Sequence, residues 1–178
     1  LAAWLVLPNW QSRQWPALAE QALRSQAAYL EEIVAQAGAG KQDHLAYRLA
    51  RRRAHSADAA RCNAYPSKLK EPVHARRMFE ACGRFLVLSH TLLNYLSALG
   101  AHRGTLAGEG EDLALRRDAA ALGARLTTLA ERLRQPQAEA ETAATPLPEL
   151  APGASTQPQL ALAMQLLGPL QREAQRMA

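Results

Sequence analysis

The segment from Leu86 to Arg103 constrains the fold more than any other part of the sequence, because a helix formed by it is apolar on most of its circumference. The large apolar side chains are spread around the helix and are Phe85, Leu86, Leu88, Leu92, Leu93, Leu96 and Leu99. A helix of this kind must be covered by neighbours on most sides. His90 and Asn94 share one face of it, being four positions apart. We expect both to be buried with polar partners, since an unsatisfied buried polar group costs about 1–3 kcal/mol.

Hydrophobic periodicity predicts five helices, and no segment shows the alternation of a strand. Their expected ranges are Trp15–Ala37, Asp43–Leu69, Val73–Ala101, Glu111–Arg134 and Gln159–Met177. We expect Pro16 in the first turn of its helix, and Pro66 to kink the second helix or end it early. Ala and Leu supply most of the apolar residues, which is typical of helical bundles. The predicted fold is all-α: an antiparallel bundle of about five helices, with a long central helical hairpin and a Pro-rich linker before the last helix.

The chain divides by composition into four expected regions. Residues 13–134 form a four-helix bundle core, residues 135–158 a Pro/Ala-rich linker, and residues 159–178 a C-terminal helix packed on the bundle. Residues 1–12 are expected to be the end of a truncated membrane helix and an entry segment. Their apolar run bears Trp4 and Trp10 but is too short for a bilayer, which needs about 20 residues. The alternative is an ordinary apolar strap packed on the bundle.

Positive charge is concentrated in residues 41–84, which hold eleven Lys and Arg against four acidic residues. Such a band could face phosphates, acidic lipid headgroups or an acidic protein. No nucleic-acid-binding motif accompanies it, so we expect no nucleic-acid partner. Cys62 and Cys82 are expected to be reduced thiols, and they lack the spacing of a metal site.

A turn at Glu71-Pro72 would fold the second and third helices into a hairpin and bring polar residues together. This pairing places His55 near Leu88–His90, and Asp58 near Phe85. The predicted cluster comprises Arg51 or Arg52, His55, Asp58, His90 and Asn94, with one arginine of the run 51–53 turned inward to Asp58.

The cluster admits three interpretations: a satisfied structural network, a ligand or anion site, and a metal or catalytic site. No nucleophile with an oxyanion site, no His-Glu-x-x-His motif and no phosphate-binding glycine loop is present. We therefore expect no enzyme activity, no catalytic residue, no metal and no cofactor.

Three motifs carry a resemblance to a known family: Ser-His-Thr-Leu-Leu-Asn-Tyr-Leu-Ser-Ala-Leu-Gly-Ala-His-Arg at 89–103, Tyr-Arg-Leu-Ala-Arg-Arg-Arg-Ala-His-Ser-Ala-Asp-Ala-Ala at 47–60, and Lys-Glu-Pro at 70–72. Over about residues 7–103 the chain resembles the soluble C-terminal part of fusaric-acid-resistance-type inner membrane proteins, in their YccS/YhfK-like branch. The residues matching the family pattern are Tyr47, Arg48, Arg51, Arg52, His55, Asp58, Glu71, Pro72, His90, Leu92, Leu93, Gly100, His102 and Arg103. The segment from Cys62 to Lys68 departs from it, because Pro66 interrupts the helix expected there.

The resemblance implies a cytoplasmic regulatory or assembly domain of a multi-pass protein, on the cytoplasmic face of the bacterial inner membrane. Such proteins are similar to exporters of aromatic and other organic acids. The implied partners are the membrane domain of the same polypeptide, further copies of the chain and acidic lipid headgroups.

Trp4, Trp10, His102 and Arg103 are expected to lie near the membrane; the alternative for His102 and Arg103 is capping of the third helix. Two other functional hypotheses remain. One is a soluble helical adaptor for an acidic protein, and the other is a sensor of small organic acids that uses the predicted cluster.

Overall fold

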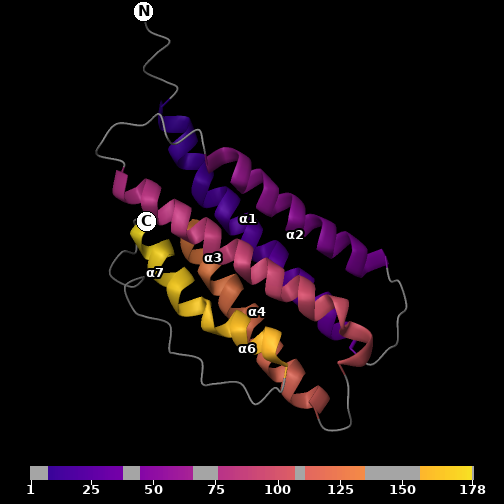
Figure 1. Cartoon of the computed structure of the whole chain (residues 1–178). Helices are drawn as coiled ribbons and strands as arrows, with labels where there is room; N and C mark the ends of the chain where they lie inside the picture. Colours follow the sequence, from indigo (N-terminus) through magenta and orange to yellow (C-terminus); the bar gives the residue numbers. More distant parts are fainter. Residues whose placement is uncertain (1–7, 38–44, 66–75, 107–110, 135–156, 178) are drawn as a thin grey trace, which may run out of the picture.

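A computed structural model of the chain describes residues 8–37, 45–65, 76–106, 111–134 and 157–177. Within these ranges the chain is helical and contains no strand, which confirms the all-α prediction. The helices are α1 (Pro8–Ala35), α2 (Leu45–Ala64), α3 (Arg76–Ala101), the short η3 (Arg103–Thr105), α4 (Glu111–Arg134), α6 (Pro158–Gln165) and α7 (Leu167–Met177) (Figure 1). Helices α1 to α4 alternate in direction, and α6 and α7 run in the same direction as α4.

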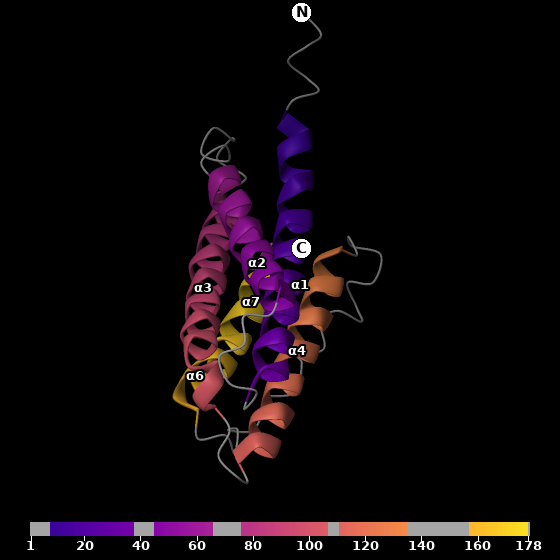
Figure 2. The same ribbon diagram turned by 90° about the vertical axis from the view of Figure 1, so that its right-hand side faces the viewer.

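Helix α1 is the element around which the others are arranged. It packs most extensively against α4 and α2, and it also contacts α3. Helices α6 and α7 cover another side of α3 (Figure 1). The N-terminal turns of α1 extend beyond the ends of α2 and α3, as Figure 2 shows.

Apolar side chains at helical spacing in the sequence predict the buried face of each helix, and the core agrees with two of these stripes. In α4 the predicted stripe runs from Leu115 to Leu133, and every member is buried. The stripe predicted for the helix at residues 15–37 is also buried, except for the partly exposed Leu18. The buried residues of these two stripes are Trp15, Ala22, Gln26, Tyr29, Leu30, Ile33, Ala37, Leu115, Ala119, Leu122, Leu126, Leu129 and Leu133. Burying a large apolar side chain contributes about 1.5–3 kcal/mol, so these two stripes account for much of the bundle's cohesion.

Helix ends agree less uniformly with the sequence pattern. Helix α4 has the predicted bounds, and α2 ends at Ala64, immediately before Tyr65 and Pro66. The expectation for Pro16 was wrong: α1 begins at Pro8, so Pro16 lies inside the helix, where its missing N–H removes one backbone hydrogen bond. Trp4, Asp43, Glu71 and Pro72 lie outside the described residues, as does most of the predicted linker.

One side of α3 faces solvent, so the expectation that His90 and Asn94 are buried was wrong. Both residues are exposed, and Val87 on the same helix is 62% exposed. The cause lies in the packing: α2 contacts α3 less extensively than it contacts α1, which leaves part of the surface of α3 uncovered.

Cys62 is half-buried and Cys82 is buried, and both are free thiols in the structure.

Candidate functional site: a polar network across three helices

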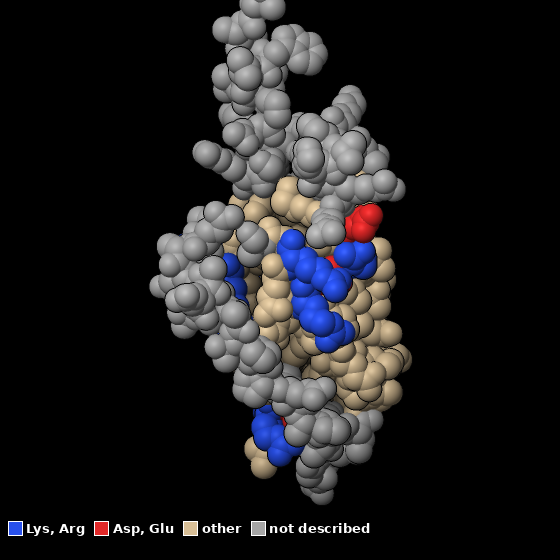
Figure 3. Space-filling view, turned by 90° about the vertical axis from the view of Figure 1, so that its left-hand side faces the viewer, with Lys and Arg blue, Asp and Glu red and all other residues tan. Residues whose placement is uncertain are grey.

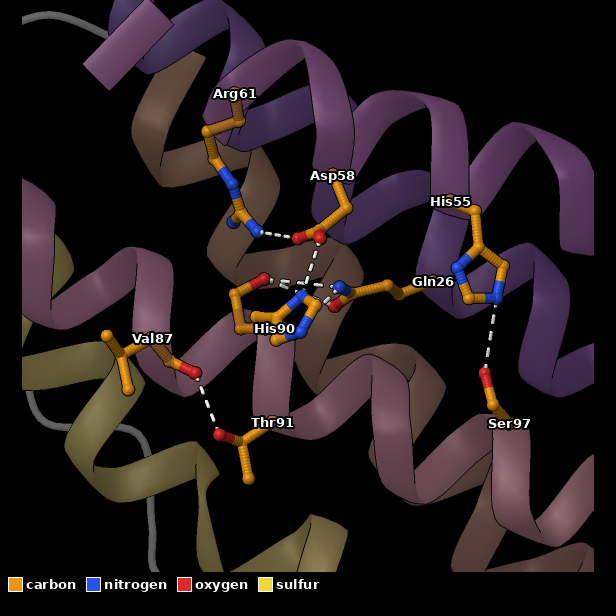
Figure 4. A network of polar contacts seen from close by, with 9 residues as sticks. Gln26, His55, Asp58, Arg61, Val87, His90, Thr91 and Ser97 are labelled. Atoms are coloured by element: carbon orange, nitrogen blue, oxygen red, sulfur yellow. Dashed lines mark hydrogen bonds and ion pairs between the residues drawn. The ribbon is translucent and has the colours of Figure 1, made fainter. Parts of the chain in front are cut away.

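Asp58 of α2 is the centre of a polar network between α2 and α3 (Figure 4). Its side chain is buried and accepts hydrogen bonds from Arg61 of the same helix and from Nδ1 of His90 on α3, the latter at 2.7 Å. The His90 side chain itself is 52% exposed. The carboxylate therefore joins a buried cation on one side to a solvent-facing imidazole on the other.

Arg61 is a fully buried cation, which is rare for an arginine. One nitrogen of its guanidinium binds Asp58, whereas Nε and Nη1 have no hydrogen-bond partner among the described residues. Its guanidinium carbon lies 5.7 Å from the centroid of the Phe85 ring, within the range of a cation–π interaction. Burial lowers the pKa of Arg61 and the Asp58 carboxylate raises it, so Asp58 is what makes this buried charge tolerable.

A second pair of buried side chains joins α1 to the same turn of α3. The Gln26 amide nitrogen lies 3.0 Å from the Ser89 carbonyl oxygen and 3.2 Å from Ser89 Oγ, and it donates to both. Ser89 precedes His90, so this turn of α3 is held from α1 and from α2 at once (Figure 4).

His55 does not join the Asp58 carboxylate. Its Nε2 lies 3.3 Å from Ser97 Oγ of α3, and its side chain is exposed at the surface. Burial, with Arg51 second, lowers the pKa of His55, and Asp58 opposes this shift.

The structure thus divides the predicted cluster. Asp58 and His90 are joined as members of one network, whereas His55 lies apart and Asn94 points to solvent. Arg51 and Arg52 are exposed, so the prediction that an arginine of the run 51–53 turns inward was wrong. Arg61 occupies that role, because it lies one turn from Asp58 on the buried face of α2.

Sequence reasoning missed both Arg61 and the Gln26–Ser89 contact. The signal for Arg61 was its spacing, since it follows the buried residues Ala54, Ala57 and Asp58 at helical intervals. The pairing of α2 with α3 is also displaced: Asp58, expected beside Phe85, meets His90, about five residues further along α3.

A second cluster closes the end of the bundle away from Pro8. The hydroxyls of Tyr29 and Tyr47 lie 3.2 Å apart, and burial together with Tyr47 raises the pKa of Tyr29. Arg103 stacks on the Tyr47 ring at 4.1 Å and donates hydrogen bonds to the Gln36 side chain and the Gly100 carbonyl, each at 3.1 Å. The contact with Gly100 is the helix-capping interaction proposed for Arg103. The Arg103 side chain thereby joins the last turn of α3 to Gln36, the residue that follows α1.

Gly100 is required where these aromatic residues meet. A Cβ atom added there would lie 2.7 Å from the Tyr47 hydroxyl oxygen and 2.8 Å from that of Tyr29. Arg103 contacts the C-terminal end of α1, and Trp10 belongs to its N-terminal part. The structure therefore does not bring Trp10 and the pair His102 and Arg103 to one end of the bundle.

Comparison with known proteins links part of this chain to an inner membrane protein. The inner membrane protein YccS of Escherichia coli (strain K12) is 41% identical over 101 residues, which is 57% of this chain and 14% of that protein. An uncharacterized protein of Haemophilus influenzae is 42% identical over 96 residues, covering 54% of this chain and 13% of the relative. The chain thus spans less than a sixth of the length of the curated relatives it matches. No protein-family model and no solved structure matches it.

Two features are absent from the described residues. Within these ranges no helix is both long and apolar enough to cross a bilayer. The same ranges contain no group of three or more His, Cys, Asp or Glu side chains placed to hold a metal ion.

Proposed function

We propose that this chain is a cytoplasmic regulatory or assembly domain of a YccS-like inner membrane protein. The observation that carries the proposal is the 41% identity to the Escherichia coli inner membrane protein over 101 residues. We propose a non-enzymatic role, because the sequence contains no nucleophile with an oxyanion site and no phosphate-binding glycine loop. Export of aromatic or other organic acids by the whole protein is part of the proposal and rests on the family resemblance alone.

The connections of α1 support a role in coupling. Its side chains bind α3 through Gln26, α2 through Tyr29 and α7 through Trp15, whose Nε1 lies 3.3 Å from Met177 Sδ. Close-packed helices transmit displacement instead of absorbing it. A shift or rotation of α1 would therefore reach α2, α3 and α7 together, and the projecting N-terminal turns of α1 offer a point at which such a shift could be applied (Figure 2).

The cytoplasmic location is tested by fusing reporters after Ala178 of the full-length protein in Escherichia coli. Green fluorescent protein at this position should fluoresce, and alkaline phosphatase should be inactive. Active phosphatase with a dark fluorescent protein would overturn the location. In the same cells, the fusions should sediment with the inner membrane.

The regulatory or assembly role is tested by deleting residues 8–177 from the full-length protein. The remaining membrane part should still insert but should change its oligomeric state on native gels or lose export of aromatic carboxylates. Unchanged assembly and unchanged export would contradict the proposal. The variant Gly123→Ala, at an open site in α4, is a matched control that should preserve both.

A further inference from the structure

A surface groove between α1 and α2 is lined by hydrogen-bond donors and, among its described residues, by no acidic side chain. Its volume is about 460 Å³, and its described lining residues are Gln21, Ser25, Leu49, Arg52, Arg53, Ser56, Ala57 and Ala60. This volume falls in the range of small-molecule sites, about 300–1,000 Å³. The groove is separate from the Asp58 network, because none of its lining residues belongs to that network.

The charges in the groove are uncompensated within the described chain. Arg52 and Arg53 are exposed neighbours in sequence, and the structure shows no hydrogen bond or ion pair from either to another described residue. The acidic residue of α2 among the described positions, Asp58, is buried and already bonded to Arg61 and His90. Arg52 and Arg53 therefore bring two positive charges to one groove with no carboxylate among its described lining residues, and a dianion bound there would be neutralised by both.

The remaining lining residues define what else the ligand needs. The Ser56 hydroxyl and the side-chain amide of Gln21 can donate hydrogen bonds to an oxyanion. The Ser25 hydroxyl instead donates to the backbone carbonyl of Gln21, at 2.7 Å. Leu49, Ala57 and Ala60 form an apolar wall beside these donors. Leu49 is 41% exposed, so it has apolar surface available for a ligand.

We propose that the α1–α2 groove binds a small phosphate monoester, with Arg52 and Arg53 on the phosphate and Leu49 against the organic part. A phosphate monoester carries about −1.5 to −2 charges near pH 7, which matches two arginines, whereas a monocarboxylate would neutralise one. The same phosphate chemistry exists in a soluble metabolite and in a lipid headgroup. The inference goes beyond the proposed function, and only the choice between these two sources rests on the membrane attachment proposed above.

The position of the groove favours the soluble source. Gln21 lies about 13 residues, or roughly 20 Å of helix, from the start of α1 at Pro8. A membrane at the N-terminal end of α1 would therefore be distant from the groove that Gln21 lines together with Arg52 and Arg53.

Titration of the 178-residue chain with phenyl phosphate, followed by amide NMR, tests the proposal directly. Resonances of Ser25, Arg52, Arg53 and Ser56 should shift saturably, and inorganic phosphate should compete. Benzoate should bind about tenfold more weakly, because it engages one arginine instead of two. Benzoate binding as tightly as phenyl phosphate, or shifts spread over all exposed arginines, would overturn the proposal.

Matched variants locate the site. Arg52→Ala and Arg53→Ala should each weaken phenyl phosphate binding about tenfold. Arg51→Ala, on the same helix but outside the groove, should change it less than about twofold. Equal losses in all three would show a diffuse charge effect and refute the site.

Vesicles separate the two sources of phosphate. Vesicles with about 20 mol% phosphatidic acid, a composition on the order of the anionic content to which basic segments respond, should not retain the chain more than neutral vesicles do. Retention that is lost in Arg52→Ala, with no response to phenyl phosphate, would assign the groove to lipid and overturn the soluble ligand.

Discussion

The Asp58 network and the second cluster, formed by Tyr29, Tyr47, Gly100 and Arg103, both join α1, α2 and α3, but by different physical means. In the first, a carboxylate links a buried guanidinium to a half-exposed imidazole, and two guanidinium nitrogens stay unpaired within the described chain. In the second, two tyrosine rings meet over a residue without a side chain, and an arginine covers them. Charge balance stabilises one region and shape complementarity the other, so the two should fail under different substitutions.

A third contact, between α3 and α7 at the surface of the bundle, also depends on charge balance. Arg84 of α3 and Arg176 of α7 both bind the buried carboxylate of Glu173, at 3.0 and 2.6 Å. Figure 3 shows basic side chains gathered on one face of the molecule, with few acidic ones beside them. Here too a buried acid holds two helices together, but its arginines are half-exposed and share the charge with water.

Asp58→Asn should have the largest effect, because it leaves Arg61 as a buried charge without a counter-ion. We expect a loss of about 3 kcal/mol in the free energy of unfolding, measured by urea denaturation. The double variant Asp58→Leu with Arg61→Met removes both charges and should recover most of that loss. A double variant as unstable as Asp58→Asn would show that packing, and not charge, determines this region.

Gly100→Ala should cost about 2 kcal/mol, because the new methyl group overlaps the tyrosine hydroxyls and cannot be accommodated without displacing a ring. The control is Gly123→Ala, where an added Cβ meets nothing within 4 Å. This control should stabilise the chain by about 0.5–1 kcal/mol through helix propensity. In thermal unfolding, a lower midpoint for Gly100→Ala and a higher midpoint for Gly123→Ala would confirm that the tyrosines approach Gly100 closely. A change in the same direction for both variants would contradict it.

His90→Ala should cost less than about 1 kcal/mol, since its side chain is half-exposed and its bond to Asp58 is shared with solvent. The measurement is urea denaturation at low and high salt. A loss close to that of Asp58→Asn would mean that His90, and not Arg61, is the partner on which Asp58 depends.

The smallest effect concerns His55 and pH. Its pKa is lowered in the folded chain from an ordinary value of 6.5, so the unfolded chain binds a proton more readily as pH falls through that value. His55 should therefore favour unfolding below about pH 6.5, by less than about 0.5 kcal/mol because water screens it. His55→Gln should reduce the difference in unfolding free energy between about pH 8 and about pH 5. An increased difference would mean that folding raises the pKa of His55 instead of lowering it.

Local periodicity predicted where the helices lie and which faces of α1 and α4 are buried, because both depend on neighbouring residues in sequence. The stripe of α4 from Leu115 to Leu133 illustrates this, since all of it is buried. Periodicity did not predict that the face of α3 bearing His90 and Asn94 is exposed. The pairing between helices was harder to predict. It depends on how far α3 extends past α2. The predicted pairing placed Asp58 beside Phe85, whereas in the structure its partner is His90, about five residues further along α3.

The candidate site was predicted in part for the same reason. Asp58 and His90 were identified as polar residues on facing helices, which required only their helical positions. Arg61 was missed because an arginine is expected at the surface. The partner of Asp58 was predicted instead among the arginines at 51–53. Only the tertiary structure reveals that α2 turns its Arg61 inward and leaves that run in solvent.

The contact between Trp15 and Met177 joins residues 162 positions apart and has a consequence for synthesis. A ribosome adding about 5–20 residues per second needs roughly 8–30 s to travel that distance. During this interval the Trp15 ring has been made but its final neighbour has not. The nascent chain must therefore keep the Trp15 side chain of α1 away from other molecules until α7 has been made.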